Sequence, residues 1–244
     1  MIERLKKWFL GIGSFFILVG VIYGIVWILT TNDAKASEGK FTVSNQTSGQ
    51  VENNISVIPY LLPVEDTYSK PRTEKITHVV IHFTSNATNN PLDPYNIQEV
   101  YQIFLDNEVS SHYMIGRDGE VYQLVDENRV AYHAGKGKLN SFPDYEDKLN
   151  EYSIGIELLA VGTEGEMAAM MNEDVYQSIP SSNIGYTDAQ YAALNFLLED
   201  IFHRYDSIVR DRLHVIGHDE YAPERKTDPG SLFDWSRVKL EDQR

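Results

Sequence analysis

The sequence predicts an α/β fold, with a central mixed β-sheet flanked by helices and preceded by an N-terminal transmembrane helix. In residues 71–240, apolar segments typical of buried strands alternate with segments that carry helical spacing. Near the amino terminus, a long apolar run carries no charge. We therefore divide the 244 residues into a membrane anchor or signal segment at 1–32, an extracytoplasmic linker at 33–70 and a globular domain at 71–240.

The apolar run covers residues 8–32 and has no charged side chain. A helix rises about 1.5 Å per residue, so about 20 of these residues would cross a hydrocarbon core of about 30 Å. Arg4, Lys6 and Lys7 precede the run, which favours a cytoplasmic amino terminus. We expect a single-pass cell-membrane protein with an extracytoplasmic domain. The alternative is secretion after cleavage at an A-x-A-like site near Ala36.

Charge and composition exclude several classes of function. The formal net charge is −15, and because residues 1–32 carry +2, the remainder carries −17. Such a chain would repel nucleic acid, so we expect no nucleic-acid partner. The sequence has no cysteine, which excludes disulfides, iron–sulfur clusters and thiol nucleophiles. Any metal must be held by His, Asp or Glu. Residues 33–70 are rich in Ser, Thr, Asn, Gln and Glu, as linkers are.

The first half of the globular domain shows a strand, a helix and a hairpin. Residues 76–83 (ITHVVIHF) are apolar on both faces, which is typical of a central strand. Residues 96–106 place their apolar side chains on one helix face. Residues 110–115 and 120–125 flank an Asp-Gly pair, a strong turn signal, and are expected to form a β-hairpin.

The second half continues the alternation. Residues 153–159 (SIGIELL) are expected to form another interior strand, and Thr187 opens a helix with a capping-box pattern. Residues 213–216 are expected to form a last short strand. The segment 161–186 fits no element, and loops of this length are usually functional or disordered. Our hypothesis is that it closes over a substrate; surface decoration is the alternative.

Histidines are the candidate reactive residues, and the sequence has seven of them. His82 lies at the end of an interior strand, the rim at which α/β folds bind ligands. His78, on the same strand, is expected to be a core residue with satisfied hydrogen bonds. His214 and His218 are four apart, but Gly217 and the β-branched neighbours oppose a helical metal pair. No HExxH motif is present, which excludes a zincin protease.

Five motifs occur in order: VVIHFT, SSHYMIGRDGEVYQLV, AYHAG, SIGIEL and HDEYAPERKTDPG. Together they resemble the zinc-dependent N-acetylmuramoyl-L-alanine amidases of the amidase-2 family, whose fold is shared with peptidoglycan recognition proteins. The resemblance covers about residues 72–236. It implies that residues 71–240 are an amidase catalytic domain around a central mixed sheet.

The resemblance also implies roles for five residues. His82, His218 and Asp228 match the zinc ligands of the family, Glu157 matches its catalytic glutamate, and Lys226 matches the lysine that assists at the reacting carbonyl. Two imidazoles and one carboxylate would leave the fourth tetrahedral position of Zn²⁺ for water, as in catalytic sites. His112 and His133 lie in motifs that line the cleft or support the core, and we do not expect them to be ligands.

The resemblance implies that the reaction is hydrolysis of the amide between N-acetylmuramic acid and L-alanine in peptidoglycan. We expect the protein to be a monomer. The first alternative is a membrane-tethered peptidoglycan-binding module without turnover, which a Glu157→Ala variant would distinguish because only an enzyme loses its rate. The second is a cytosolic enzyme that recycles cell-wall fragments, because the loop HDEYAPERKTDPG resembles that branch. The apolar residues 8–32 argue against the second alternative.

Overall fold

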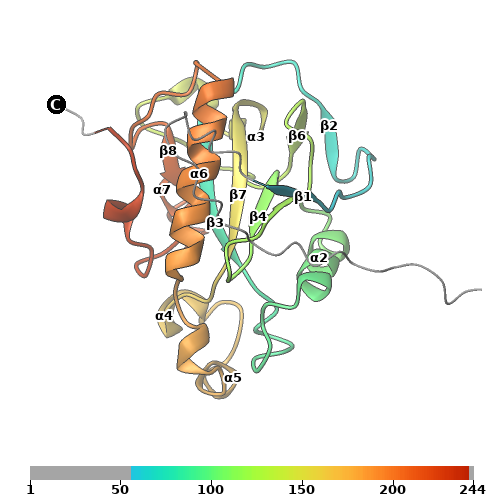
Figure 1. The fold of residues 1–244 in the computed structure, drawn as a ribbon, viewed down its shortest axis with the longest axis vertical. Helices are drawn as coiled ribbons and strands as arrows, with labels where there is room; N and C mark the ends of the chain where they lie inside the picture. Colours follow the sequence, from blue (N-terminus) through green and yellow to red (C-terminus); the bar gives the residue numbers. More distant parts are fainter. Residues whose placement is uncertain (1–55, 242–244) are drawn as a thin grey trace, which may run out of the picture. The chain divides into compact units, whose positions relative to one another are not determined.

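A six-stranded mixed β-sheet forms the centre of the domain in the computed structural model, which describes residues 56–241 (Figure 1). The strand order is β1-β5-β4-β7-β3-β8, and only β4 and β5 pair antiparallel. The strands are β1 (Val57–Pro59), β3 (His78–Thr84), β4 (Tyr113–Ile115), β5 (Val121–Gln123), β7 (Ser153–Leu159) and β8 (Val215–Gly217). The predicted mixed sheet is confirmed, and so is the hairpin, whose strands are shorter than expected.

The two longest strands, β3 and β7, lie side by side at the centre and run parallel. Their pairing extends from His78 opposite Ser153 to Thr84 opposite Leu159. Every residue of β7 is buried, and so is every residue of β3 except Thr84. Strands covered on both faces are expected to be apolar throughout, so the polar residues among them are the exceptions that locate a site.

One face of the sheet is covered by α6 (Asp188–Arg204), which crosses in front of the central strands in Figure 1. Thr187 caps this helix with the predicted capping box. The buried side chain of Gln190 donates to the carbonyl oxygens of Ile115 and Leu159, which ties the helix to two strands. The apolar side chains beneath belong to alternate strand positions and the inner helix face, including Val79, Ile81, Ile156, Leu194, Leu197 and Ile201.

The opposite face is covered in two separate places. On one side, α2 (Ile97–Asp106), which Asn96 caps, packs Val100 and Phe104 against Met114 and Leu124. On the other side, α3 (Leu149–Tyr152) and α7 (His218–Tyr221) contribute Leu149 and Tyr221 to a cluster around Val80. The candidate site lies on this face, at the end of β3 and β7.

The 161–186 segment is folded. It contains α4 (Glu164–Met167), α5 (Glu173–Gln177) and the 3-10 turn η2 (Ser181–Asn183), drawn at the lower end of Figure 1. Its two ends meet where Val161 pairs with Ile184. Met167, Met171 and Ile179 are buried against Phe83, so the segment has an apolar cluster of its own.

The remaining elements lie at the edges of the domain. Part of the predicted linker contributes β1 to the central sheet, while β2 (Ser69–Pro71) pairs antiparallel with β6 (Arg129–Ala131). Short 3-10 turns occur at η1 (Pro143–Tyr145) and η3 (Trp235–Arg237). The segment 1–32, predicted to be a transmembrane helix, lies outside the described residues. Within residues 56–241, the structure has no helix with the length and apolar character that a membrane span requires.

Candidate active site

The floor of the site is built from one face of β3 and β7. Side chains two apart in a strand point to the same face, so His78, Val80 and His82 share a face of β3. Across the parallel pair, His82 lies in register with Glu157. Both side chains are buried, with 2% and 8% of their residue surface exposed. The sheet therefore places a histidine and a carboxyl group next to each other at the carboxyl ends of two strands.

His218 reaches the same place from the neighbouring strand. Ile81 of β3 pairs with Gly217, the last residue of β8, and the residue that follows each of them in the sequence is a histidine. The imidazole rings of His82 and His218 have centroids 4.5 Å apart. The loop after α7 returns Asp228 between them. Its Oδ2 lies 2.7 Å from Nδ1 of His82 and 3.0 Å from Nδ1 of His218.

These three residues fit a metal ion, because their donor atoms all lie within 4.8 Å of one another. His218 Nε2 lies 2.8 Å from the carbonyl oxygen of Ala134, which can only accept a hydrogen bond. A neutral His218 therefore carries its proton on Nε2 and turns the lone pair of Nδ1 toward the carboxylate of Asp228. A lone pair facing a carboxylate oxygen is repulsive, and a cation held between them relieves the repulsion.

Burial and charge set the protonation of this cluster. Burial alone would raise the pKa of Asp228, but the close contacts of its carboxyl group with His218 and His82 outweigh burial and hold this pKa well below its ordinary value. Burial, with the neighbouring His218, lowers the pKa of His82 to about 4. At neutral pH the cluster therefore offers a carboxylate and a neutral imidazole from His82, the forms that bind a metal.

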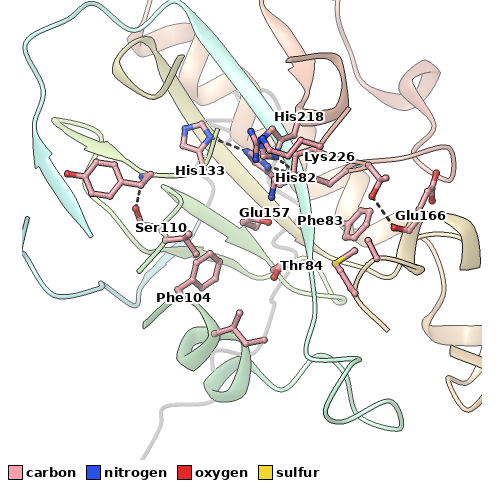
Figure 2. Close-up of a pocket in the computed structure, with 18 residues that line it drawn as sticks. His82, Phe83, Thr84, Phe104, Ser110, His133, Glu157, Glu166, His218 and Lys226 are labelled. Atoms are coloured by element: carbon pink, nitrogen blue, oxygen red, sulfur yellow. Dashed lines mark hydrogen bonds and ion pairs between the residues drawn. The ribbon is translucent and has the colours of Figure 1, made fainter. Parts of the chain in front are cut away.

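Glu157 and Lys226 complete the group. Burial first, and then the charge of Asp228, raises the pKa of Glu157 to about 8, while Lys226 acts in the opposite direction. Both residues line a cavity of about 300 Å³ over the metal-ligand cluster. Figure 2 shows His82, His218 and Lys226 gathered beside Glu157. All five predicted site residues thus lie together, and their predicted roles stay proposals.

Two walls flank this cavity. One comes from α2 and the segment after it, with Ile103, Phe104 and Val109. The other includes Glu166, Ala169 and Met170 from the 161–186 segment. Glu166 accepts hydrogen bonds from the backbone N–H groups of Thr163 (2.7 Å) and Ser231 (2.6 Å), so this wall is joined to the loop that carries Asp228. The 161–186 segment therefore forms one wall of the cavity. This position is compatible with our hypothesis that the segment closes over a substrate, which stays a prediction.

The sequence did not indicate how the AYHAG motif serves the site. The side chain of Asn150 accepts hydrogen bonds from the backbone N–H groups of His133 (3.1 Å) and Ala134 (2.8 Å). Thus anchored, Ala134 presents its carbonyl oxygen to His218, and His133 places Nδ1 3.0 Å from Nε2 of His82. His112 is buried beneath and accepts from the N–H of Gly155 at 3.0 Å. The hydrogen bond between His218 and the carbonyl oxygen of Ala134 could not be predicted from the sequence, because every residue has a backbone carbonyl group.

Comparison with known proteins decides the family. The family model described as N-acetylmuramoyl-L-alanine amidase matches residues 72–231, which contain all five site residues. The chain belongs to this amidase family. The predicted resemblance is therefore confirmed, as are the prediction of an enzyme and that of the reaction, hydrolysis of the amide between N-acetylmuramic acid and L-alanine.

Individual relatives of this chain are also amidases, in agreement with the family assignment. The 1,6-anhydro-N-acetylmuramyl-L-alanine amidase AmpD of Haemophilus influenzae is 32% identical over 184 residues, covering 69% of this chain and 83% of the relative. AmpD of Escherichia coli K12 is 34% identical over 132 residues, covering 54% and 57%. The crystal structure of a selenomethionine derivative of AmpD matches with a TM-score of 0.50 and 27% identity, covering 76% of this chain and 94% of that one.

The predicted location is corrected. We expected a single-pass protein of the cell membrane with an extracytoplasmic catalytic domain, or a secreted form cleaved near Ala36. The relatives named above, which align with up to 69% of this amidase, are 1,6-anhydro-N-acetylmuramyl-L-alanine amidases, and they overturn this prediction. Its basis was the apolar run of residues 8–32, the cations before it and the A-x-A-like site near Ala36, none of which shows where the domain that follows works. The prediction of a monomer stays a prediction.

Proposed function

We propose that this amidase depends on Zn²⁺ held by His82, His218 and Asp228, and that its substrates are muramyl peptides with a 1,6-anhydro sugar. The observation that carries the proposal is the convergence of two imidazole Nδ1 atoms on one carboxylate oxygen at the floor of a cavity that Glu157 also lines. Closed structural zinc sites use four protein ligands, whereas three ligands facing a cavity are typical of catalysis.

Zinc bound there would supply Lewis acidity, which lowers the pKa of a water molecule from 15.7 toward about 7 and polarises a carbonyl oxygen. Glu157 takes the proton of the attacking water and delivers it to the departing amine nitrogen of L-alanine. Its buried position suits this task, because a carboxyl group whose pKa is raised toward neutrality accepts and releases a proton near neutral pH. The nearby cation of Lys226 acts in the opposite direction and lowers the pKa of Glu157.

Lys226 holds the charge that develops on the substrate. Its ammonium group faces the cavity beside Glu157 and His82, and lowers the pKa of both. A cation at this position stabilises the oxyanion of the tetrahedral intermediate, and losing such a stabiliser typically costs about 2.7 to 4 kcal/mol in the barrier. The role of Lys226 is therefore electrostatic.

The substrate class rests on the relatives. Their names specify a 1,6-anhydro-N-acetylmuramyl group, and one of them aligns with this chain over 83% of its own length. We place the catalytic domain at residues 71–240, with β1 and β2 contributed by residues of the preceding linker. The wall formed by Glu166, Ala169 and Met170 would select among muramyl peptides.

The test is product analysis with two substrates. The purified chain is incubated with a 1,6-anhydromuramyl peptide and with polymeric peptidoglycan, each with and without a chelator. We expect stem peptides with a free L-alanine amine, released faster from the anhydro fragment, and no release with chelator. Chelator-resistant release would contradict the zinc proposal, and faster release from the polymer would contradict the substrate proposal.

A peptidoglycan-binding module without turnover predicts a different result. A Glu157→Gln variant keeps the shape of the site and removes the proton acceptor. If the protein only binds, the wild type releases no peptide and the variant has the same affinity. For the amidase that the family assignment indicates, the variant keeps its affinity and loses the rate.

A further inference from the structure

We propose that His133 and Ser153 act as a positioning pair that fixes which nitrogen of His82 carries the proton, so that Nδ1 is left bare for the metal. The inference rests on the proposed zinc function and assigns a role to two residues outside the metal-ligand set. Three hydrogen bonds carry it. They run from the backbone of α3 through Ser153 and His133 to His82.

The direction of these hydrogen bonds follows from the first of them. Ser153 Oγ lies 2.6 Å from the carbonyl oxygen of Leu149, which can only accept, and 3.3 Å from Nε2 of His133. A hydroxyl group has one proton, and the shorter contact takes it. Ser153 therefore accepts from His133, which must carry its proton on Nε2.

The rest of the chain of bonds is then determined. With its proton on Nε2, a neutral His133 has a bare Nδ1, and this atom lies 3.0 Å from Nε2 of His82. His82 Nε2 must donate, so its Nδ1 is bare and points toward Asp228, 2.7 Å away. The opposite direction would put a proton on Nδ1 of His82, where it competes with a metal ion. Metal-bound histidines commonly have their other nitrogen fixed by such a partner.

His133 lies beside His82 at the cavity, so its ring can reach the ligand histidine directly. The ring is partly buried in the wall of the cavity, where Figure 2 shows it beside His82 with a dashed line between them.

Strand β7 is shaped to hold this ring. One face of the strand carries Ser153, Gly155 and Glu157, which are two residues apart. A Cβ atom on Gly155 would lie 2.6 Å from Cγ of His133, so a larger residue would displace the imidazole. The S-x-G-x-E pattern of the strand thus supplies a hydrogen-bond acceptor, the space for the ring and the proposed general base.

Substitutions at both members of the pair test the proposal. In His133→Asn, the side-chain oxygen can replace Nδ1 as an acceptor, whereas His133→Leu has no acceptor. Ser153→Ala removes the acceptor for His133. The matched control is Ser111→Ala, because Ser111 is also fully buried and its hydroxyl group has no hydrogen-bond partner among residues 56–241.

The measurement is the dissociation constant for zinc, obtained by competition with a chromophoric chelator, with thermal unfolding measured in parallel. We expect His133→Leu to weaken zinc binding by about 10- to 100-fold, as is typical for loss of such a partner. Ser153→Ala should weaken it less, while His133→Asn and Ser111→Ala should stay near the wild-type value. In the zinc-loaded wild type, NMR should detect a slowly exchanging proton on Nε2 of His82, and Ser153→Ala should accelerate its exchange.

The outcomes separate this proposal from the proposed function. Zinc binding by the wild type with unchanged affinity in His133→Leu and Ser153→Ala would overturn the positioning role and leave the zinc enzyme intact. Unchanged affinity with a lower kcat at saturating zinc would also overturn it, because His133 would then act on the substrate. A wild type without stoichiometric zinc would overturn both proposals.

Discussion

Two histidines on one face of β3 show what distinguishes a site from a core. His78 and His82 are four residues apart, and both are buried, with 0% and 2% of their surface exposed. Burial lowers the pKa of each to about 4. His82 faces a second imidazole and a carboxylate. His78 instead packs against the rings of Phe142 and His214, with centroids 4.7 and 5.1 Å away.

The difference lies in the partners of the two rings. His78 bonds to Thr77 through Nδ1 at 2.8 Å, while its Nε2 has no partner within residues 56–241. In His82 both nitrogens are oriented, one by His133 and the other by Asp228. Burial and a lowered pKa are thus shared by both histidines, and only the convergence of donors from distant segments distinguishes the proposed metal site.

The largest expected effect is the difference in zinc content and hydrolysis rate between a variant of His82 and a variant of His78. We expect His82→Gln to lose stoichiometric zinc and to slow amide hydrolysis by about 10³-fold or more, since the metal supplies several kcal/mol of charge stabilisation. His78→Phe should keep both the zinc and the rate, because an aromatic ring still fills its place. Metal analysis and peptide release, measured on folded protein, check this, and loss of zinc in both variants would erase the distinction.

Glu157 separates metal binding from turnover within the site. Glu157→Gln should lower kcat by about 10² to 10⁴-fold, the usual contribution of a positioned proton-transfer group. Zinc content should not fall, because Glu157 is not one of the three converging ligands. A variant that retains the wild-type rate would remove Glu157 from its proposed role.

Lys226 tests the electrostatic part of the account. Lys226→Met keeps the length of the side chain without its charge, and should lower kcat by about 10² to 10³-fold. Lys239→Met is the matched control, since Lys239 is exposed and does not line the cavity over the proposed zinc ligands. Equal rates in the two variants would argue against stabilisation of an oxyanion by Lys226.

His78 should contribute to a smaller effect, the loss of stability in acid. Its pKa is about 4 in the folded protein and about 6.5 when unfolded, so the unfolded chain binds more protons as the pH falls from 6.5 to 4. Stability is therefore full above pH 6.5 and decreases below it, by up to about 3 kcal/mol for this one group. His78→Phe should flatten the dependence of unfolding free energy on pH.

Urea unfolding between pH 7 and pH 5 measures that slope. The control is His203→Phe, because the side chain of His203 is 72% exposed. If His78→Phe and His203→Phe have the same slope as the wild type, the acid sensitivity belongs to other buried groups.

Much of the fold could be predicted from local patterns. Apolar runs predicted β3 and β7, and helical spacing predicted α2. The capping box at Thr187 predicted the start of α6. The three-residue strands β1, β2 and β6 were not predicted, because so short a segment has no measurable periodicity. The turn α7 was also missed, since Pro223, Pro229 and Gly230 suggested a loop from His218 onward.

The candidate site divides in the same way. The five predicted residues come together because the motifs that carry them end neighbouring strands or follow them. The supports behind them could not be predicted: Asn150, the carbonyl of Ala134 and the bond between Ser153 and His133 depend on how loops fold back on the sheet. His78 is buried as expected, but its Nε2 lacks the hydrogen bond that we predicted for a core histidine.

The most direct test of the central claim combines metal analysis with turnover in one preparation. The zinc content of the purified chain and of an Asp228→Asn variant is measured, and the release of stem peptides from a 1,6-anhydromuramyl peptide is followed in both. The account predicts one zinc ion per wild-type chain, chelator-sensitive release, and loss of both in the variant. Wild-type turnover without stoichiometric metal, or undiminished zinc and turnover in Asp228→Asn, would contradict it.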